Sequence, residues 1–258
     1  MKVGTNKFKQ ALTEGRPTFG LWAAIPDPTC AEIVAGAGFD WVVVDSEHGP
    51  FSVQDVLRHL QVLEAYDSVA LVRAVEGQTA VIKQLLDVGA QTLIVPMVES
   101  LDQAKRIVQA AYYPPVGVRG VGTALVRAAR WNRIEGYARD ANKEICIIAQ
   151  IESVAGLENA AEIAAVEGID AVFLGPADLS ASMGLVGQPD HPDVIAAILS
   201  VIETALAAGK QAGVLAVKPE LVARYLNAGA RFVGVGADTT LFANAVTSLA
   251  DTYCSQSE

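Results

Sequence analysis

The chain has 258 residues, 52% of them hydrophobic, and its formal net charge is −10. This length is common for an eight-fold α/β barrel, and the apolar content is sufficient for a large core. The acidic balance argues against nucleic acid or an anionic membrane surface as the main partner, because both carry negative charge.

Local features of the sequence indicate a reduced protein that does not cross a membrane. The longest apolar runs are strand-sized, and the N-terminal segment lacks the apolar core of a signal peptide. Cys30, Cys146 and Cys254 are far apart and show no paired spacing. We therefore expect free thiols in a cytoplasmic protein, without a disulfide or a zinc site.

Eight apolar runs have the length and composition of strands that are buried on both faces, as in a parallel sheet. In chain order they are residues 18–24, 41–45, 69–73, 91–97, 145–152, 171–175, 211–216 and 231–236. Segments with helical periodicity alternate with them, at residues 28–35, 53–64, 79–88, 102–112, 154–166, 192–208, 220–227 and 239–252. This alternation predicts an α/β fold, a (β/α)8 TIM barrel that forms a single domain over residues 1–258.

One long segment, residues 114–142, interrupts this alternation between the fourth and fifth predicted strands. It is rich in glycine and contains Arg119, Arg127, Arg130 and Arg133. Long insertions at the functional rim of a barrel are often lids or subunit contacts. We expect this segment to lie on that rim and to have one of these two roles.

Two acidic residues mark the ends of neighbouring predicted strands: Glu152 is the last residue of the fifth, and Asp178 follows the sixth. Their separation of 26 residues is about one strand–helix repeat, so both should lie on the same rim of the barrel. Two carboxylates there suit a hard cation such as Mg²⁺ or Mn²⁺ that leaves positions open for substrate oxygens. Either residue alone could instead be a helix cap or a surface acid.

His48 lies three residues after Asp45, just beyond the second predicted strand. A carboxylate within reach can fix the tautomer of an imidazole and keep its other nitrogen basic. The pattern predicts that His48 is a general base with Asp45 as its partner, although an isolated histidine is more often structural. His59, within a helix, and His191, in a loop, are expected to be structural.

Arg73 is the only cation at the end of a predicted strand that faces the mouth of the barrel. A fixed guanidinium can stabilise an enolate as its charge develops, or it can simply pair with an acid on the rim. A Schiff-base mechanism would need a lysine inside a strand, and Lys218, which flanks the seventh strand, is the only residual candidate. The sequence therefore assigns carbanion stabilisation to a metal.

Several long motifs, spread in order over nearly the whole chain, resemble one enzyme family. They are WVVVDSEHG at 41–49, LVR at 71–73, IKQLLDVGA at 82–90, VPMV at 95–98, VRGVG at 118–122, QIE at 150–152 and GPAD at 175–178. The chain resembles the HpcH/HpaI-type metal-dependent 2-oxo-acid aldolases of the phosphoenolpyruvate/pyruvate superfamily. These include 4-hydroxy-2-oxoheptanedioate aldolase and 2-dehydro-3-deoxyglucarate aldolase.

The resemblance implies a role for each matching residue. Glu152 and Asp178 would ligate a divalent metal, Mg²⁺, Mn²⁺ or Co²⁺. Gln150 would hold the oxo-acid end of the substrate. Backbone and wall positions of the substrate pocket would be Gly175, Pro176, Ala177, Asp178, Leu215 and Trp22.

The same resemblance implies the catalytic groups. His48 would accept the proton, with Asp45 as its partner, and Arg73 would stabilise the enolate oxygen. Asp87 matches a position that raises the basicity of the histidine and that can come from a neighbouring subunit. The family is generally hexameric, and the last helix would pack on a neighbouring barrel.

Together these features predict a class II aldolase that cleaves and forms 4-hydroxy-2-oxo acids, with pyruvate or hydroxypyruvate as donor and an aldehyde as acceptor. One alternative is an acyl-CoA or dicarboxylate carbon–carbon lyase on the same scaffold, with the arginines of residues 119–133 as the CoA-binding patch. A second is a catalytically silent barrel that binds a metabolite or serves as an assembly subunit.

Overall fold

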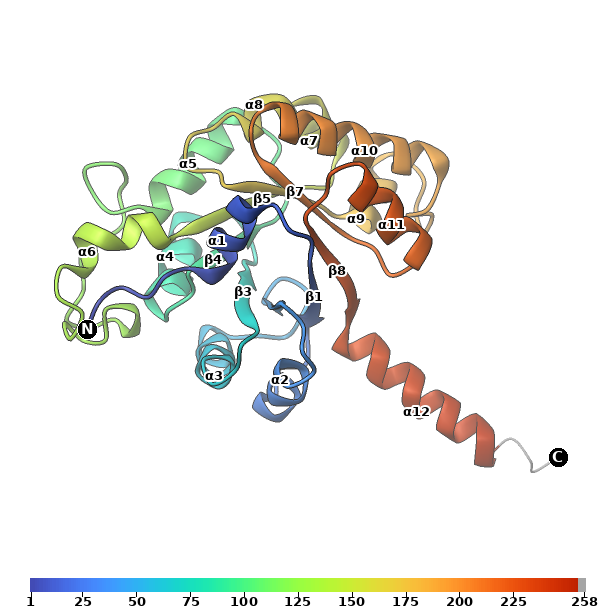
Figure 1. Ribbon diagram of the computed structural model, residues 1–258, viewed down its shortest axis with the longest axis horizontal. Coiled ribbons are helices and arrows are strands. Elements are labelled where there is room, and N and C mark those ends of the chain that lie inside the picture. Colours follow the sequence, from blue (N-terminus) through green and yellow to red (C-terminus); the bar gives the residue numbers. More distant parts are fainter. Residues whose placement is uncertain (255–258) are drawn as a thin grey trace.

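The computed structural model describes residues 1–254 and shows eight parallel strands that close into a barrel in sequence order (Figure 1). The strands are β1 (Thr18–Ala23), β2 (Trp41–Asp45), β3 (Val69–Arg73), β4 (Thr92–Val95), β5 (Cys146–Ile151), β6 (Ala171–Leu174), β7 (Gln211–Leu215) and β8 (Phe232–Ala237). The predicted TIM barrel is confirmed. Residues 255–258 lie outside the described part, so the predicted extent of the domain is not tested at that end.

Helices cover the outside of the barrel and return the chain from the carboxyl ends of the strands to their amino ends. They are α2 (Pro28–Ala35), α3 (Val53–Leu63), α4 (Thr79–Asp87), α5 (Leu101–Ala111), α7 (Val154–Glu158), α8 (Ala160–Ala164), α10 (Pro192–Ala207) and α11 (Pro219–Asn227). The short helix α9 (Pro176–Ser182) lies between β6 and α10, and α12 (Asp238–Cys254) follows the last strand. The single helix expected at 154–166 is two short helices, α7 and α8, that meet at Asn159. Helix α9 was not among the expected elements.

Helix α1 (Lys7–Glu14), also absent from the sequence prediction, packs against the amino ends of the strands. Its Phe8 ring lies edge-on to Trp41 and to Phe232, at centroid distances of 6.2 and 5.4 Å. The side chain of Asn6 caps the helix by accepting from the Lys9 amide at 3.0 Å. The helix thus closes the end of the barrel opposite the candidate site.

The insertion between α5 and β5 is mostly irregular and contains only η1 (Arg127–Ala129), α6 (Tyr137–Asp140) and η2 (Ala141–Glu144). It follows a helix rather than a strand, so it lies at the amino end of the barrel. Contacts confirm this, because Arg127 donates to the carbonyl of Val88 just after α4 at 3.0 Å. The expectation that this segment lies on the functional rim is wrong.

Helix α12 projects away from the barrel (Figure 1). Its apolar side chains are largely exposed, with exposed fractions from 50% to 75% at Leu241, Phe242, Val246, Leu249 and Tyr253. Packing of this helix on a neighbouring subunit stays a prediction. Across residues 1–254, the helices are all too short or too polar to cross a lipid bilayer.

Replacing Asn6 by alanine should destabilise the protein by about 2 kcal/mol, because a helix cap and buried hydrogen bonds are lost together. Asn6 is 2% exposed, and its Nδ2 donates to Thr92 Oγ1 and to the Glu144 carbonyl, both at 2.9 Å. Urea unfolding measures the change. The exposed Gln10, substituted in the same way, should stay within about 0.5 kcal/mol. Equal effects of the two substitutions would contradict this account.

Candidate metal and active site

The carboxyl ends of β2 and β3 place Asp45 and Arg73 side by side, because the two residues are partners in the parallel register. Arg73 Nε and Nη2 donate to the two carboxylate oxygens of Asp45 at 2.8 and 2.6 Å. Both residues are buried, and the guanidinium carbon lies 5.9 Å from the ring centroid of Trp22. A two-point ion pair over an aromatic ring fixes the guanidinium on the rim.

Glu47 is a member of this cluster that the sequence analysis missed. Its Oε2 lies 2.8 Å from Arg73 Nη1, but the contact lacks hydrogen-bond alignment. Burial raises the pKa of Glu47 despite the attraction of Arg73. Its position two residues after Asp45, beside a strand that ends in arginine, was the signal available in the sequence.

His48 lies at the edge of the same cluster, with its side chain 64% exposed. The ring Nε2 is 4.0 Å from Glu47 Oε2, whereas Asp45 meets only the backbone amide of His48, at 3.4 Å. The expectation that Asp45 orients the imidazole is therefore corrected. Both oxygens of the Asp45 carboxylate accept from Arg73. The exposed imidazole is accessible to a substrate or to a neighbouring subunit.

Glu152 follows β5 directly and points into the mouth of the barrel, where it is 2% exposed. Its Oε1 accepts from the Met97 amide at 2.9 Å, and its Oε2 accepts from the side-chain amide of Gln150. A Cβ at Gly175 would lie 2.4 Å from Oε2, so only glycine leaves room for this carboxylate. Burial raises the pKa of Glu152 to about 7.

Asp178 lies in the first turn of α9, after β6, and its side chain is exposed. Strands β5 and β6 are neighbours in the barrel, so Glu152 and Asp178 lie on the same rim, as expected. The charges of Asp178 and Glu47 both act to raise the pKa of Glu152. Ala177 is exposed beside Asp178, whereas Gly175 and Pro176 are buried in the turn that links β6 to α9.

The oxygen atoms around Glu152 fit a hard divalent cation. Gln150 is 2% exposed and its Oε1 has no hydrogen-bond partner among the described residues. Glu152 is a buried carboxylate whose charge is opposed by neighbouring acids, and a cation would relieve both penalties. No cluster of three or more His, Cys, Asp or Glu side chains in residues 1–254 could hold a metal. A site with two carboxylate ligands would leave the other positions to substrate and water.

The remaining pocket residues lie deeper in the barrel. Trp22 is 5% exposed and packs on Phe173, with ring centroids 5.2 Å apart. Leu215 is half-buried, and a Cβ at Gly234 would meet both Leu215 and Trp22. The Trp22 ring thus forms an apolar floor beneath the Arg73 guanidinium.

Asp87 does not lie near His48 within this chain. It ends α4 and therefore lies at the amino end of the barrel, since each returning helix runs against the strands. Its Oδ1 accepts from Arg119 Nη2 at 2.8 Å, and Arg119 is 1% exposed with its guanidinium 4.5 Å from the Tyr113 ring centroid. Any contact between Asp87 and His48 requires a second subunit.

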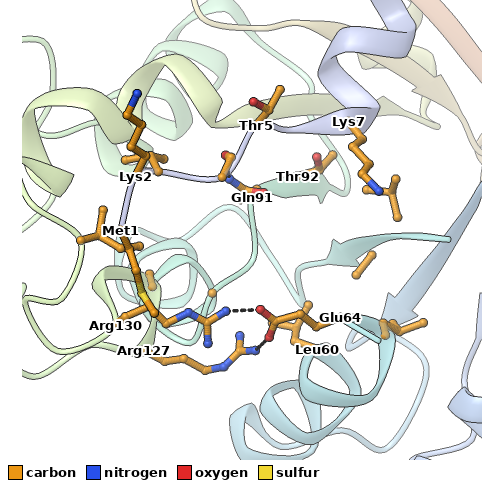
Figure 2. A pocket seen from close by; sticks show the side chains of 18 of the residues that line it. Met1, Lys2, Thr5, Lys7, Leu60, Glu64, Gln91, Thr92, Arg127 and Arg130 are labelled. Atoms are coloured by element: carbon orange, nitrogen blue, oxygen red, sulfur yellow. Dashed lines mark hydrogen bonds and ion pairs between the residues drawn. The ribbon is translucent and has the colours of Figure 1, made fainter. Parts of the chain in front are cut away.

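A large hollow at the amino end of the barrel is lined by the N-terminal residues, α3 and the insertion (Figure 2). Arg127 and Arg130 point into it and both pair with Glu64 between them. Their charges are therefore satisfied within the chain. The hollow lies at the end of the barrel opposite the rim that carries Glu152. Since both arginines already pair with Glu64, the hollow is not a ready site for another anion.

A family model described as HpcH/HpaI aldolase/citrate lyase matches residues 18–245. The chain belongs to the HpcH/HpaI aldolase/citrate lyase family. The membership predicted from the sequence motifs is thereby confirmed.

Proteins named as aldolases are among the relatives of this chain. The chain is 54% identical to the hydroxypyruvate/pyruvate aldolase of Deinococcus radiodurans, over 96% of this chain and 90% of that protein. It is 50% identical to the 4-hydroxy-2-oxo-heptane-1,7-dioate aldolase of Escherichia coli, over 97% and 96% of the two chains. Among solved structures, an HpcH/HpaI family protein from Burkholderia cenocepacia superposes with a TM-score of 0.92, at 35% identity over 96% of this chain and 99% of that one.

Metal affinity should depend on pH through Glu152. The pKa of about 7 means that this carboxyl binds a proton below neutral pH, and a cation must displace that proton. Lowering the pH from 8 to 6 should weaken Mn²⁺ binding about tenfold, which an electron paramagnetic resonance titration at constant ionic strength measures. Equal affinities at the two pH values, with unchanged circular dichroism, would contradict the raised pKa.

Proposed function

We propose that this protein is a divalent-metal-dependent aldolase that cleaves and forms 4-hydroxy-2-oxo acids, with pyruvate or hydroxypyruvate as donor and an aldehyde as acceptor. The observation that carries the proposal is the buried Glu152 carboxylate on the rim that also holds the Asp45–Arg73 pair. Support comes from relatives at 50–54% identity that are named as aldolases of these donors or of a 4-hydroxy-2-oxo acid.

In this proposal Glu152 and Asp178 hold the cation, which is Mg²⁺, Mn²⁺ or Co²⁺. The bound cation would polarise the oxo group of the donor and accept electron density when the carbon–carbon bond breaks. Gln150 would bind the oxo-acid end through one N–H of its side-chain amide, since the other donates to Glu152 Oε2. The backbone of Ala177 and Asp178 would bind the same end of the substrate. Trp22 and Leu215 would exclude water from the reacting carbons.

Arg73 supplies a fixed positive charge for the enolate that forms on cleavage. Its Nε and Nη2 are held by Asp45, while Nη1 makes only an unaligned contact with Glu47. Nη1 thus forms an ion pair with Glu47 but donates no aligned hydrogen bond among residues 1–254, and its N–H groups would bind a substrate oxygen. Because the guanidinium is already held, little reorganisation is needed as charge develops.

His48 acts as the general base in the proposed cleavage. Its exposed ring accepts the proton of the C4 hydroxyl, the C3–C4 bond breaks, and an aldehyde leaves. The pyruvate enolate is then protonated at C3, and synthesis runs the same steps in reverse. Asp87 of a neighbouring subunit would orient the imidazole in a homohexamer, a role that Asp45 does not fill within the chain.

Two rival chemistries are disfavoured by the structure. Lys218 is half exposed and lies 2.5 Å from Asp190, whose hydrogen bond raises the pKa of the lysine, whereas a Schiff-base lysine needs a lowered pKa. The arginines of the insertion lie at the wrong end of the barrel for CoA bound at this rim. Arg119 pairs with Asp87, and Arg127 pairs with Glu64.

Glu152→Ala should abolish metal-dependent release of pyruvate from a 4-hydroxy-2-oxo acid, with a loss of at least about a hundredfold. The measurement is pyruvate release in Mg²⁺, Mn²⁺ and Co²⁺, with Mn²⁺ binding followed separately. Glu76→Ala is a matched control, since Glu76 is an exposed acid in the turn between β3 and α4, at the same end of the barrel. Normal turnover by Glu152→Ala, or undiminished activity after chelation, would refute the proposal.

His48→Ala should lower the rate of aldol cleavage by about a hundredfold or more and leave Mn²⁺ affinity unchanged, because the imidazole moves a proton and holds no metal. His191→Ala serves as the control, since that side chain lies beside Asp193 at the start of α10. Steady-state kinetics and a metal titration separate the two effects. A parallel loss of metal binding would show that His48 is a ligand rather than the base.

A further inference from the structure

We propose that Gln103 is a positioning residue for the metal site, because it fixes the backbone turn whose amide orients Glu152. The turn follows β4 and consists of Pro96 to Glu99. This inference rests on the proposed function, since it takes Glu152 to be a metal ligand. The experiment below separates its failure from a failure of that function.

Met97 is the residue of the turn that contacts the site, and its backbone is unusual. Its φ is 52°, in the left-handed region that residues other than glycine seldom adopt. Its amide donates to Glu152 Oε1 at 2.9 Å, while its side chain is 44% exposed. The Met97 side chain is thus only partly packed, and contacts made by the backbone help to hold this strained conformation.

Gln103, in the first turn of α5, provides these contacts. Its Nε2 donates to the Met97 carbonyl at 2.9 Å, and its Oε1 accepts from the Glu99 amide at 2.8 Å. Only a side-chain amide offers a donor and an acceptor at this spacing. Gln103 therefore clamps both sides of the turn at once.

Glu99 continues the network to the strand that carries the ligand. Its carbonyl accepts from Asn159 Nδ2 at 2.8 Å, and its carboxylate accepts from Ser153 Oγ at 2.7 Å. Ser153 is the residue after Glu152. The turn after β4 and the end of β5 are thus joined both through the Met97 amide and through Glu99.

The Glu152 carboxylate is confined on two sides. Gln150 and the bare backbone of Gly175 confine Oε2, and the Met97 amide confines Oε1. Without the two hydrogen bonds of Gln103, the turn can leave its strained conformation. The Met97 amide then no longer holds Oε1 in place. The carboxylate must then be ordered when a cation binds, so affinity falls.

The test is Mn²⁺ affinity, measured by electron paramagnetic resonance titration of the full chain without substrate. Gln103→Ala should weaken binding about threefold to tenfold, a smaller effect than loss of a direct partner of the ligand. Gln103→Met keeps the length of the side chain without its amide and should show the same loss. If Gln103→Ala does not fold, this second variant carries the test.

Two controls separate positioning from general destabilisation of α5. Gln109→Ala removes an exposed glutamine from the same helix and should change nothing. Ser100→Ala removes the cap that accepts from the Gln103 amide at 3.3 Å, so it should lower the melting temperature but leave Mn²⁺ affinity intact. Unchanged affinity in the Gln103 variants, or an equal loss in Ser100→Ala, would overturn the inference.

Glu152→Ala distinguishes a failure of the proposed metal site from a failure of the proposed role of Gln103. If it leaves Mn²⁺ binding intact, the proposed metal site itself fails. If it abolishes binding while both Gln103 variants bind normally, the proposed function stands and only the role of Gln103 is refuted.

Discussion

Removal of the Glu152 carboxylate from water is the constraint on which the rest of the rim depends. The residue is 2% exposed, and burial together with nearby acids raises its pKa to about 7. An ionised carboxylate in such a place is tolerated only if donors or cations compensate for lost hydration. The chain supplies two donors, from Met97 and Gln150, and leaves the rest of the compensation to a bound cation in the proposed function.

A nearby part of the rim, at the ends of β2 and β3, compensates the buried positive charge of Arg73. Arg73 is 6% exposed and is balanced by the two-point contact with Asp45 and the nearby Glu47. The fixed guanidinium of Arg73 and the Glu152 carboxylate, whose charge is only partly compensated by donors, thus lie on the same rim at the ends of β3 and β5. With a cation held by that carboxylate, as proposed, negative charge would develop on the substrate between two positive groups. The residues that hold both groups are in place before the substrate arrives.

Sequence reasoning and structure agree best where a residue's position depends on the strand period alone. The parallel pairing of β2 with β3, and of β5 with β6, places Asp45 beside Arg73 and Glu152 on the same rim as Asp178. Agreement fails where the detail depends on side-chain geometry. Proximity in sequence suggested that Asp45 serves His48, but the register offers the carboxylate a buried guanidinium on the next strand, which is the stronger partner. Glu47 was missed for the same reason.

The sequence by itself determined the barrel, its strand order, its family and the residues at the strand ends, because apolar period and motif spacing are local properties of the chain. Only the tertiary structure decided which side chains meet. It placed the insertion at the amino end, showed that Asp87 pairs with Arg119 within the chain, and revealed the clamp of Gln103 on the turn at Met97. These contacts join separate segments of the chain, and their relative placement follows from packing and from backbone angles such as the positive φ of Met97. No local pattern of residues encodes such contacts.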